Sequence, residues 1–434
     1  MDVGADEFEE SLPLLQELVQ EADFVGLDIE FTGLRSNLSG PQQISLFDLP
    51  SEWYLKTRQS VQQFTICQIG LSVFSAIEGE ANKYIAHSCN FYLFPTTFGI
   101  LDSEFSFQAS SVQFLNQYGF NYNKFLKNGI PYMNEEQEKK IRHDILTGNW
   151  RVRSSPDKDQ IKVVIDQVTR WLELAKEGDW MTLPGITESY NQFKQNIHSL
   201  FPVLIDTKSV TKDIWKEMNF PRVSNLSEVY EVLNSDLNPT KNSGPEIVHA
   251  SRCEKYVETK CPHEAAYDAF LCGSVLLKVA HLLLQKIYHI DPVPKSSFPQ
   301  YLDVLAPYVN QVNLIRAGVP KINFSGPDYP SIRPPILILS VKRWPVVSEQ
   351  QVYHTFQNLC KFDVRRLTRS QFLLLTNKFK DARNILKEYR DHPTLCISLY
   401  RYWRHSPNVN CLLQVCGIVT AWALLAFILG RSGP

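Results

Sequence analysis

The sequence predicts an α/β body, then a small α+β module and a C-terminal transmembrane helix. Strand-like runs fill the first half of the body and helix-like runs the second. A compact β-α-β-β-α-β series follows a proline-rich stretch, and an uncharged apolar run lies near the end of the chain. With 434 residues, 44% of them hydrophobic and 21% charged, the chain has the size and composition of two or three folded domains.

The body is expected to span residues 1–295 and to contain a mixed sheet with flanking helices. Strands are expected over 24–34, 63–74, 82–95 and 202–207. Helices are expected over 8–22, 112–126, 135–146, 161–176, 227–233 and 263–288. The nine cysteines form no C-x-x-C pair and no apolar run follows Met1, which favours reduced thiols facing the cytosol.

A proline-rich connector over 296–330 leads to the module, which is expected over 331–402. Its element order is typical of an RRM-like fold, in which aromatic side chains on the sheet stack on RNA bases. Trp344 and Phe372 are the nearest candidates for that role. A ferredoxin-like module that packs or dimerises without touching RNA is the alternative. Strands are expected over 336–341, 364–368, 371–375 and 395–400, and helices over 348–360 and 377–389.

Charge is distributed unevenly along the chain. Residues 331–410 carry 14 Lys and Arg against 5 Asp and Glu, whereas residues 1–330 carry 29 against 41. A basic module beside an acidic body suggests that a polyanion is held at one end of the protein, although a solvated basic face would have the same composition.

The apolar run over 411–430 is interrupted only by Gln414 and Thr420. About 20 apolar residues in a helix match the thickness of a bilayer core. Trp403 before the run and Arg431 after it are typical interfacial anchors. We therefore expect a single-pass tail anchor with the bulk of the chain in the cytosol; a buried core helix is the alternative.

Two short motifs could carry chemistry. Asp28 and Glu30 are two residues apart on a predicted strand, so their carboxylates share one face and would repel each other without a cation between them. Oxygen ligands of this kind favour Mg²⁺ or Mn²⁺. His263 and Asp268 open the long apolar helix, where an acid is costly unless it is paired or bound to metal.

Together these motifs resemble the DEDDh exonucleases, and specifically the poly(A)-specific ribonuclease (PARN) family. The stretches 64–70 (FTICQIG), 92–95 (YLFP) and 206–208 (DTK) are also similar to that family, and the resemblance runs through the module. It implies a ribonuclease H-like body. The tail anchor is similar to that of a membrane-anchored branch of the family that trims precursors of piRNAs.

The resemblance implies two-metal hydrolysis of RNA, with Asp28, Glu30 and Asp268 as ligands of two Mg²⁺ or Mn²⁺ ions. His263 would orient and deprotonate the attacking water. The implied substrate is the 3′ end of single-stranded RNA, either poly(A) or pre-piRNA-like. The family also implies a possible homodimer, and any protein adaptor is unidentified.

One part of the family pattern is missing. The family has a fourth carboxylate in an H-N-x-x-x-D motif, but between Pro184 and Asp206 the only acid is Glu188. The sequence thus predicts an internal deletion near 187–188, which would reduce activity, remove an inner element of the sheet and expose apolar surface. Asp206 is a possible substitute ligand.

Two functions therefore remain open. The first is a 3′-to-5′ exoribonuclease with reduced activity; the second is a non-catalytic, membrane-tethered RNA-binding or scaffold protein. The anchor is expected in the endoplasmic reticulum membrane because the span is strongly apolar and only Arg431 follows as a charge. The mitochondrial outer membrane is the alternative.

Overall fold

The computed structural model describes residues 1–34, 44–95, 103–133, 135–147, 187, 189–288, 296–314, 319–330, 333–342 and 347–431. They form two compact units. The body comprises Met1–Gln42, Leu55–Asn313 and Asn323–Pro327, and the module comprises Gln43–Tyr54, Leu314–Ile322 and Asp328–Pro434. An early stretch of the sequence thus belongs to the C-terminal module. The helix expected over 161–176 lies outside the described residues.

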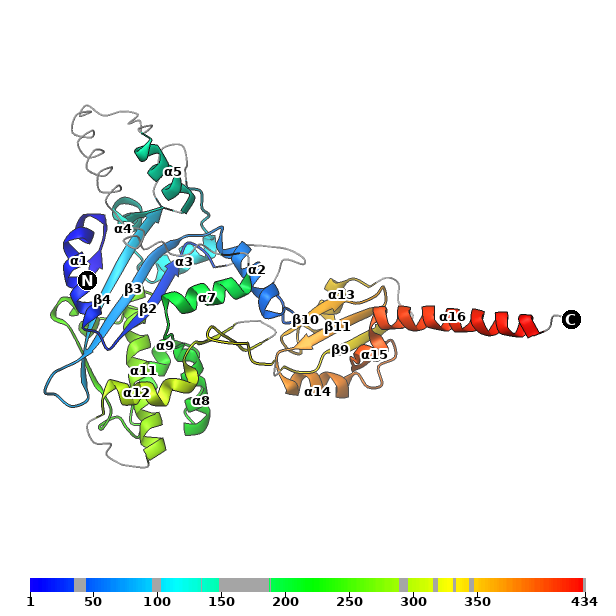
Figure 1. The fold of residues 1–434 in the computed structure, drawn as a ribbon. Helices are drawn as coiled ribbons and strands as arrows, with labels where there is room; N and C mark the ends of the chain where they lie inside the picture. Colours follow the sequence, from blue (N-terminus) through cyan, green and yellow to red (C-terminus); the bar gives the residue numbers. More distant parts are fainter. Residues whose placement is uncertain are drawn as a thin grey trace. The chain divides into compact units, whose positions relative to one another are not determined.

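A mixed six-stranded sheet organises the body (Figure 1). Strands β2, β3 and β4 are antiparallel, whereas β1, β5 and β6 pair with β4 in parallel. The predicted α/β body with a mixed sheet is therefore confirmed. In sheet order the strands are β1 (Asp2–Val3), β4 (Lys83–Pro95), β3 (Ile66–Ala76) and β2 (Phe24–Phe31), with β5 (Ile130–Tyr132) and β6 (Glu246–His249) also on β4.

Strand β2 lies at an edge of this sheet. Among the described strands it pairs only with β3. On the face away from Asp28 and Glu30, Val25 and Leu27 are 39% and 45% exposed. The helix α1 (Ala5–Gln20) packs on the side chains of β3 and β4 on that face, at Ile69 among others, and β2 lies beyond this cluster.

Two other expectations for the body are wrong. The helix expected over 112–126 is two helices, because the chain turns at Gly119, whose φ is +82°. The strand expected over 202–207 is absent; Ile205 makes only isolated bridges, and the next helix begins at Thr207. Besides α1, the helices of the body are α2 (Pro50–Val61, which begins in the module), α3 (Ala109–Gln117), α4 (Tyr122–Asn128), α5 (Glu135–Leu146), α7 (Tyr190–Leu200), α8 (Thr207–Met218), α9 (Leu226–Asn234), α10 (Lys255–Glu258), α11 (Ala265–Tyr288) and α12 (Phe298–Leu305).

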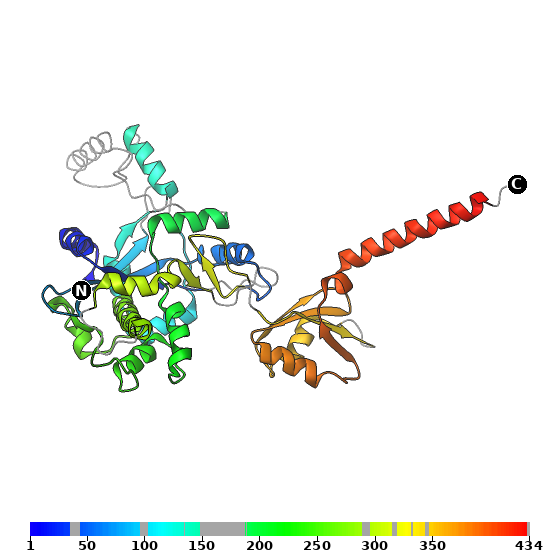
Figure 2. The same cartoon turned by 60° about the horizontal axis from the view of Figure 1, so that its bottom comes forward.

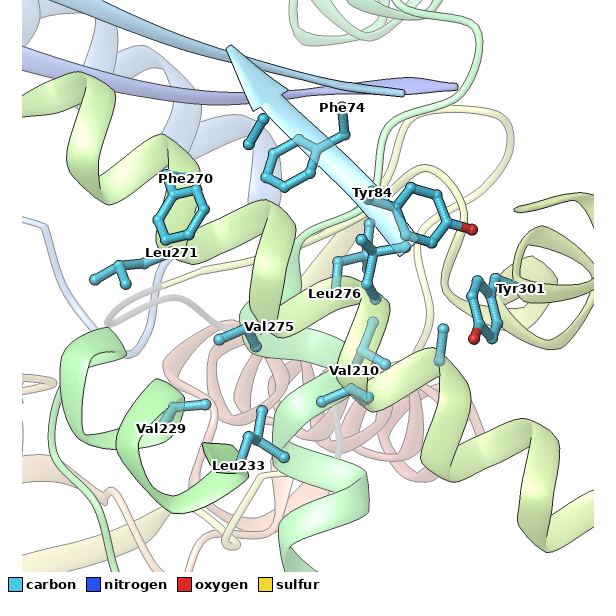
Figure 3. Packing of buried hydrophobic residues seen from close by; sticks show 14 of the residues in the cluster. Phe74, Tyr84, Val210, Val229, Leu233, Phe270, Leu271, Val275, Leu276 and Tyr301 are labelled. Atoms are coloured by element: carbon cyan, nitrogen blue, oxygen red, sulfur yellow. The ribbon is translucent and has the colours of Figure 1, made fainter. Parts of the chain in front are cut away.

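Helix α11 is the centre of the body's core. It packs across β2, β3, α8, α9 and α12, which explains why it is apolar all round. Figure 3 shows Phe270 of this helix near Phe74 of the sheet, and Leu276 near Tyr84. Although α11 is long and apolar enough to cross a membrane, most of it is buried, so it is a core helix.

The module contains a four-stranded antiparallel sheet in the order β10-β11-β9-β12. Figure 2 shows the sheet and its helices in the yellow to orange part of the chain. Its elements follow the predicted β-α-β-β-α-β order. They are β9 (Leu337–Val341), α13 (Glu349–Phe356), β10 (Phe362–Arg366), β11 (Gln371–Thr376), α14 (Phe379–Glu388) and β12 (Leu395–Leu399). The short strands β7 (Gln311–Asn313) and β8 (Lys321–Asn323) precede it along the chain.

The apolar run at the C-terminal end forms one helix, α16 (Pro407–Arg431), after the short α15 (Tyr402–His405). The stretch Pro407–Phe427 is long and apolar enough to cross a membrane, and none of it is buried in the protein. This distinguishes it from α11 and agrees with the predicted helix over 411–430.

Candidate active site

The carboxylates of Asp28 and Glu30 lie on β2, opposite Gly70 and Gln68 of β3. Both side chains are half-buried, and the pairing becomes irregular directly after Glu30. The alternation of the strand therefore presents the two acids on one face, as predicted.

Two glycines let α11 approach this face closely. A Cβ atom on Gly26 would lie 2.4 Å from the carbonyl oxygen of Ala269, and one on Gly70 only 1.9 Å from the carbonyl carbon of Ala265. Any larger residue at either position would push the helix away from the sheet. The glycines therefore bring Asp268, in the first turn of α11, to the carboxylates of β2.

Polar side chains of the sheet hold the start of α11. The backbone amide of Ala265 donates to Oε1 of Gln68 at 3.0 Å, and that of Ala266 donates to Oδ1 of Asn90 at 2.7 Å. Both acceptor residues are buried. They satisfy two of the amides that a helix N-terminus leaves without a partner, so the position of the first turn is fixed.

His263 lies just before α11 in a left-handed conformation, with φ of +64°. Its backbone amide donates to Oδ2 of Asp268 at 3.2 Å, and its Nδ1 lies 3.8 Å from the same oxygen. The imidazole packs against the rings of Phe114 and Tyr118, whose centroids lie 4.5 and 4.4 Å from its own and 5.0 Å from each other. These two aromatic residues were not predicted; an aromatic pair four residues apart on a helix was the available signal.

Ligand atoms converge at this point. One atom each from Glu30, His263 and Asp268 lie within 4.8 Å of one another, and no other group of three such residues occurs in the described part of the chain. The structure therefore brings together three of the four residues that the sequence singled out. Asp28 is on the same strand face, and its charge acts to raise the pKa of Glu30 and of His263.

The carboxylates share an environment that disfavours charge. Burial and then the charges of Asp28 and Asp268 raise the pKa of Glu30 to about 8. Burial and then the charge of Asp268 raise the pKa of Asp28 to about 6, and burial raises the pKa of Asp268 to about 6. Three acids with raised pKa values in one place are typical of a functional site.

The pKa of His263 is shifted the other way. Burial lowers it below the ordinary value for histidine, although the charge of Asp28 opposes the shift. The imidazole is therefore mainly neutral at pH 7, and its 3.8 Å approach to Asp268 is a polar contact rather than an ion pair.

Asp206, the possible substitute ligand, has another role in the structure. It is the N-cap of α8, and its Oδ1 accepts from the amide of Lys208 at 2.9 Å. Its Oδ2 accepts from the backbone amide and from Nδ2 of Asn313, at 2.7 and 2.9 Å. The described cluster does not include Asp206.

The two candidates for base stacking in the module do not provide a platform in the described structure. Phe372 is fully buried in the core between the sheet and its helices, so its ring is closed to a base. That prediction was wrong because Phe372 points to the helix side of β11. Trp344 lies outside the described residues.

Comparison with known proteins identifies the class of enzyme. The family model of the CAF1 family ribonucleases matches residues 3–179 and 180–276. The chain belongs to this ribonuclease family. Members of this family hydrolyse RNA, which agrees with the resemblance to the poly(A)-specific ribonucleases.

Several relatives of this CAF1 family member align over nearly the whole chain. Poly(A)-specific ribonuclease PNLDC1 from Homo sapiens is 79% identical, covering 95% of this chain and 98% of the relative. The same protein from Mus musculus is 69% identical, covering 100% of both chains. The pre-piRNA 3′-exonuclease trimmer of Bombyx mori is 24% identical, covering 99% of this chain and 98% of its own.

Proposed function

We propose that this chain is a 3′-to-5′ exoribonuclease that trims or degrades the 3′ ends of single-stranded RNA, either poly(A) or pre-piRNA-like. The observation that carries the proposal is the convergence of Glu30, His263 and Asp268 in a member of the CAF1 ribonuclease family. The substrate is supported by the names of the relatives, which are a poly(A)-specific ribonuclease and a pre-piRNA 3′-exonuclease.

The cluster fits a site for two Mg²⁺ or Mn²⁺ ions. Its carboxylate oxygens are the ligands that these ions prefer, and the raised pKa values reflect negative charge that a cation would neutralise. Asp28, Glu30 and Asp268 would hold the ions. When bound, two divalent ions would stabilise the charge that develops on the attacking and leaving oxygens of the phosphodiester.

His263 is suited to act as the general base. Its lowered pKa leaves a ring nitrogen free of a proton at neutral pH, so that it can accept the proton of the attacking water. Its position is fixed from two sides, by the amide hydrogen bond to Asp268 and by the rings of Phe114 and Tyr118.

The same two aromatic residues are suited to hold the 3′-terminal base. Phe114 and Tyr118 are 41% and 43% exposed, although both rings contact His263. Base stacking on aromatic rings is tolerant of sequence, as a trimming enzyme requires. We infer that they position the terminal nucleotide beside the carboxylates.

We infer that hydrolysis is slow in this form because the fourth carboxylate is missing. The alignment with the mouse relative runs over 531 positions and takes in the 434 residues of this chain, so about 97 positions have no residue of this chain opposite. The family model matches in two adjacent stretches that meet between 179 and 180, close to the predicted break. An absent strand would also account for the open edge of β2.

The C-terminal parts would keep the enzyme and its substrate at a membrane. We propose that residues 331–402 form an RRM-like module that assists RNA binding through its excess of basic residues. The apolar α16 would anchor the chain in the endoplasmic reticulum membrane as a single span. Fluorescent labelling of residues 395–434 alone tests the destination, and labelling of mitochondria would contradict it.

The decisive experiment uses the full chain in detergent with 5′-labelled single-stranded RNA and Mg²⁺ or Mn²⁺. We expect slow shortening from the 3′ end, which is lost with EDTA and in the Glu30→Gln variant. Insertion of the corresponding segment of the mouse relative near residues 179–188 should accelerate it. Shortening that continues in EDTA or in Glu30→Gln would contradict the proposal.

The open edge of β2 and the missing carboxylate favour one alternative, a non-catalytic RNA-binding or scaffold protein on the membrane. It predicts that a folded chain binds RNA equally well with and without Glu30→Gln and yields no product in either case.

A further inference from the structure

The sheet of the module has two faces of different composition. The face toward α13 and α14 carries the core side chains Leu337, Leu339, Phe372 and Leu374. Because side chains alternate along a strand, Ile338, Leu373 and Leu375 point the other way. Together with Asp363 and Arg365 of β10, which pair with Leu375 and Leu373, they form what we call the open face.

The central residues of the open face are nevertheless buried. Ile338 is 2% exposed and Leu375 is 1% exposed, although neither belongs to the core cluster beneath the helices. Two aliphatic side chains on the side of a sheet away from α13 and α14 reach such low exposure only when something lies over them. The open face therefore has a cover.

Residues 45–48, which we call the strap, contact the polar edge of the open face. The backbone amide of Leu46 and the hydroxyl of Ser45 both donate to Oδ2 of Asp363, at 2.5 and 3.1 Å. The guanidinium of Arg365 lies 5.1 Å from the ring centroid of Phe47. Hydrogen bonds to a carboxylate are among the stronger ones in proteins.

Two further contacts fasten the strap. Asp48 is fully buried, with Oδ1 3.8 Å from Nη2 of Arg365, and its Oδ2 accepts from the amide of Ser45 at 2.7 Å. The guanidinium of Arg333 donates to the carbonyl oxygen of Leu46 at 2.9 Å. Charged groups buried in this way are stabilised only by close partners, so the strap is held by a defined set of contacts.

We propose that the open face is the docking site of the strap and the start of α2, together residues 45–54, with Phe47 and Tyr54 packed on Ile338 and Leu375. Phe47 and Tyr54 are themselves buried, and both belong to the same compact unit as the sheet. This face is consequently closed to RNA bases. The positions where an RRM sheet stacks bases are aliphatic here and occupied by protein, so RNA is held by basic side chains outside the open face.

Hydrogen exchange of the full chain in detergent tests the docking. Peptides covering residues 44–50 should be protected in the parent protein, and Asp363→Ala should raise their exchange about ten-fold or more, since it removes the acceptor of Leu46 and Ser45. Asp391→Ala, in an exposed turn of the same module, is the matched control and should change nothing there. Exchange at the rate of unstructured chain in the parent protein, or equal exchange in both variants, would overturn the proposal.

A second measurement covers the case in which Asp363→Ala unfolds the module. Phe47→Ala and Leu375→Ala should each lower the melting temperature. If the two side chains are in contact, the decrease in the double variant should be clearly smaller than the sum of the two single decreases. Additive decreases in melting temperature would contradict the packing of Phe47 on Leu375.

Photocrosslinking to labelled single-stranded RNA addresses the other half of the proposal. Crosslinks in the Glu30→Gln background are expected outside β9 and β11, whereas crosslinks to Ile338, Leu373 or Leu375 would overturn the closure of this face. None of these readouts depends on hydrolysis, so their failure is distinguishable from failure of the proposed activity.

Discussion

The backbone amide of His263 donates to Oδ2 of Asp268 across a left-handed turn, at 3.2 Å. The hydrogen bond joins the proposed base to a proposed metal ligand through the main chain. The imidazole can thus be removed without loss of this contact, whereas the carboxylate cannot.

Replacement of His263 should separate catalysis from metal binding. We expect His263→Ala to slow hydrolysis by about 10²–10⁴-fold, the usual contribution of a general base, with Mn²⁺ affinity nearly retained. Asp268→Asn should lose both hydrolysis and affinity for Mn²⁺. Single-turnover rates with excess enzyme and Mn²⁺ titration calorimetry measure the two effects, and an equal loss of Mn²⁺ affinity in both variants would make His263 a ligand instead of a base.

Loss of an aromatic ring beside His263 should weaken RNA binding. We expect Phe114→Ala to reduce affinity for single-stranded RNA by about 5-fold to 100-fold, because stacking of one base contributes about 1–3 kcal/mol. Fluorescence anisotropy in the Glu30→Gln background measures this without hydrolysis. Phe379→Ala, an exposed phenylalanine of α14 that is 49% exposed, is the control, and an equal effect there would show that the loss is unspecific.

The raised pKa values predict how the stability of the metal-free protein depends on pH. The pKa of Glu30 is about 8 in the folded chain against an ordinary value of 4.5, so the folded state holds a proton that the unfolded state releases. The free energy of unfolding should therefore fall as the pH rises from about 4.5 through 8. Melting in EDTA across this range measures it.

Two controls accompany the pH experiment. Glu30→Gln should flatten the dependence between about pH 6 and 8, because its amide does not titrate and the raised pKa values of Asp28 and Asp268 lie at about 6. Saturating Mn²⁺ should reverse part of the loss at pH 8. A melting temperature in EDTA that rises with pH over the same window would contradict the assignment.

Substitution of Gly70 should disrupt the packing of α11 on β3. We expect Gly70→Ala to destabilise the body by about 3 kcal/mol or more, since its Cβ would collide with the backbone of the helix at Ala265. Gly417→Ala, in α16, meets nothing within 4 Å and should leave the melting of the body unchanged. Circular dichroism melts compare the two, and equal stability would mean that the helix can shift away from β3.

A charge at the open edge of β2 should be tolerated. Leu27 is 45% exposed, so we expect Leu27→Lys to change the free energy of unfolding by less than about 1 kcal/mol and to reduce self-association. Leu71→Lys on the neighbouring strand, next to the cluster under α1, should destabilise strongly. A large loss from Leu27→Lys, seen by denaturant titration with light scattering alongside, would mean that the edge is covered.

Local pattern was sufficient to predict much of the site. The spacing of Asp28 and Glu30 placed both acids on one strand face, and the acid at the start of a long apolar helix marked Asp268. Contacts between distant parts of the sequence were not predictable in this way. The packing of Phe114 and Tyr118 on His263 depends on how α3 lies against the start of α11, which no periodicity encodes.

Two misassignments have local causes. Asp206 precedes Thr207 and Lys208 as a helix-capping aspartate does, so its role as N-cap was available from capping preferences. Phe372 was considered for its chemistry alone, whereas its register on β11 directs it to the helices. The strap could not be foreseen, because its partners are more than 280 residues away along the chain.

The distance between β2 and α11, which carry the acids of the site, is determined by direct contact between backbone atoms. At Gly26 and Gly70 the backbone of α11 lies directly on the strands, so no side chain acts as an adjustable spacer there. Substitutions elsewhere in the core can change the melting point while the separation of the carboxylates is conserved. The stability and the dimensions of the site can thus vary independently during evolution, except at these two glycines.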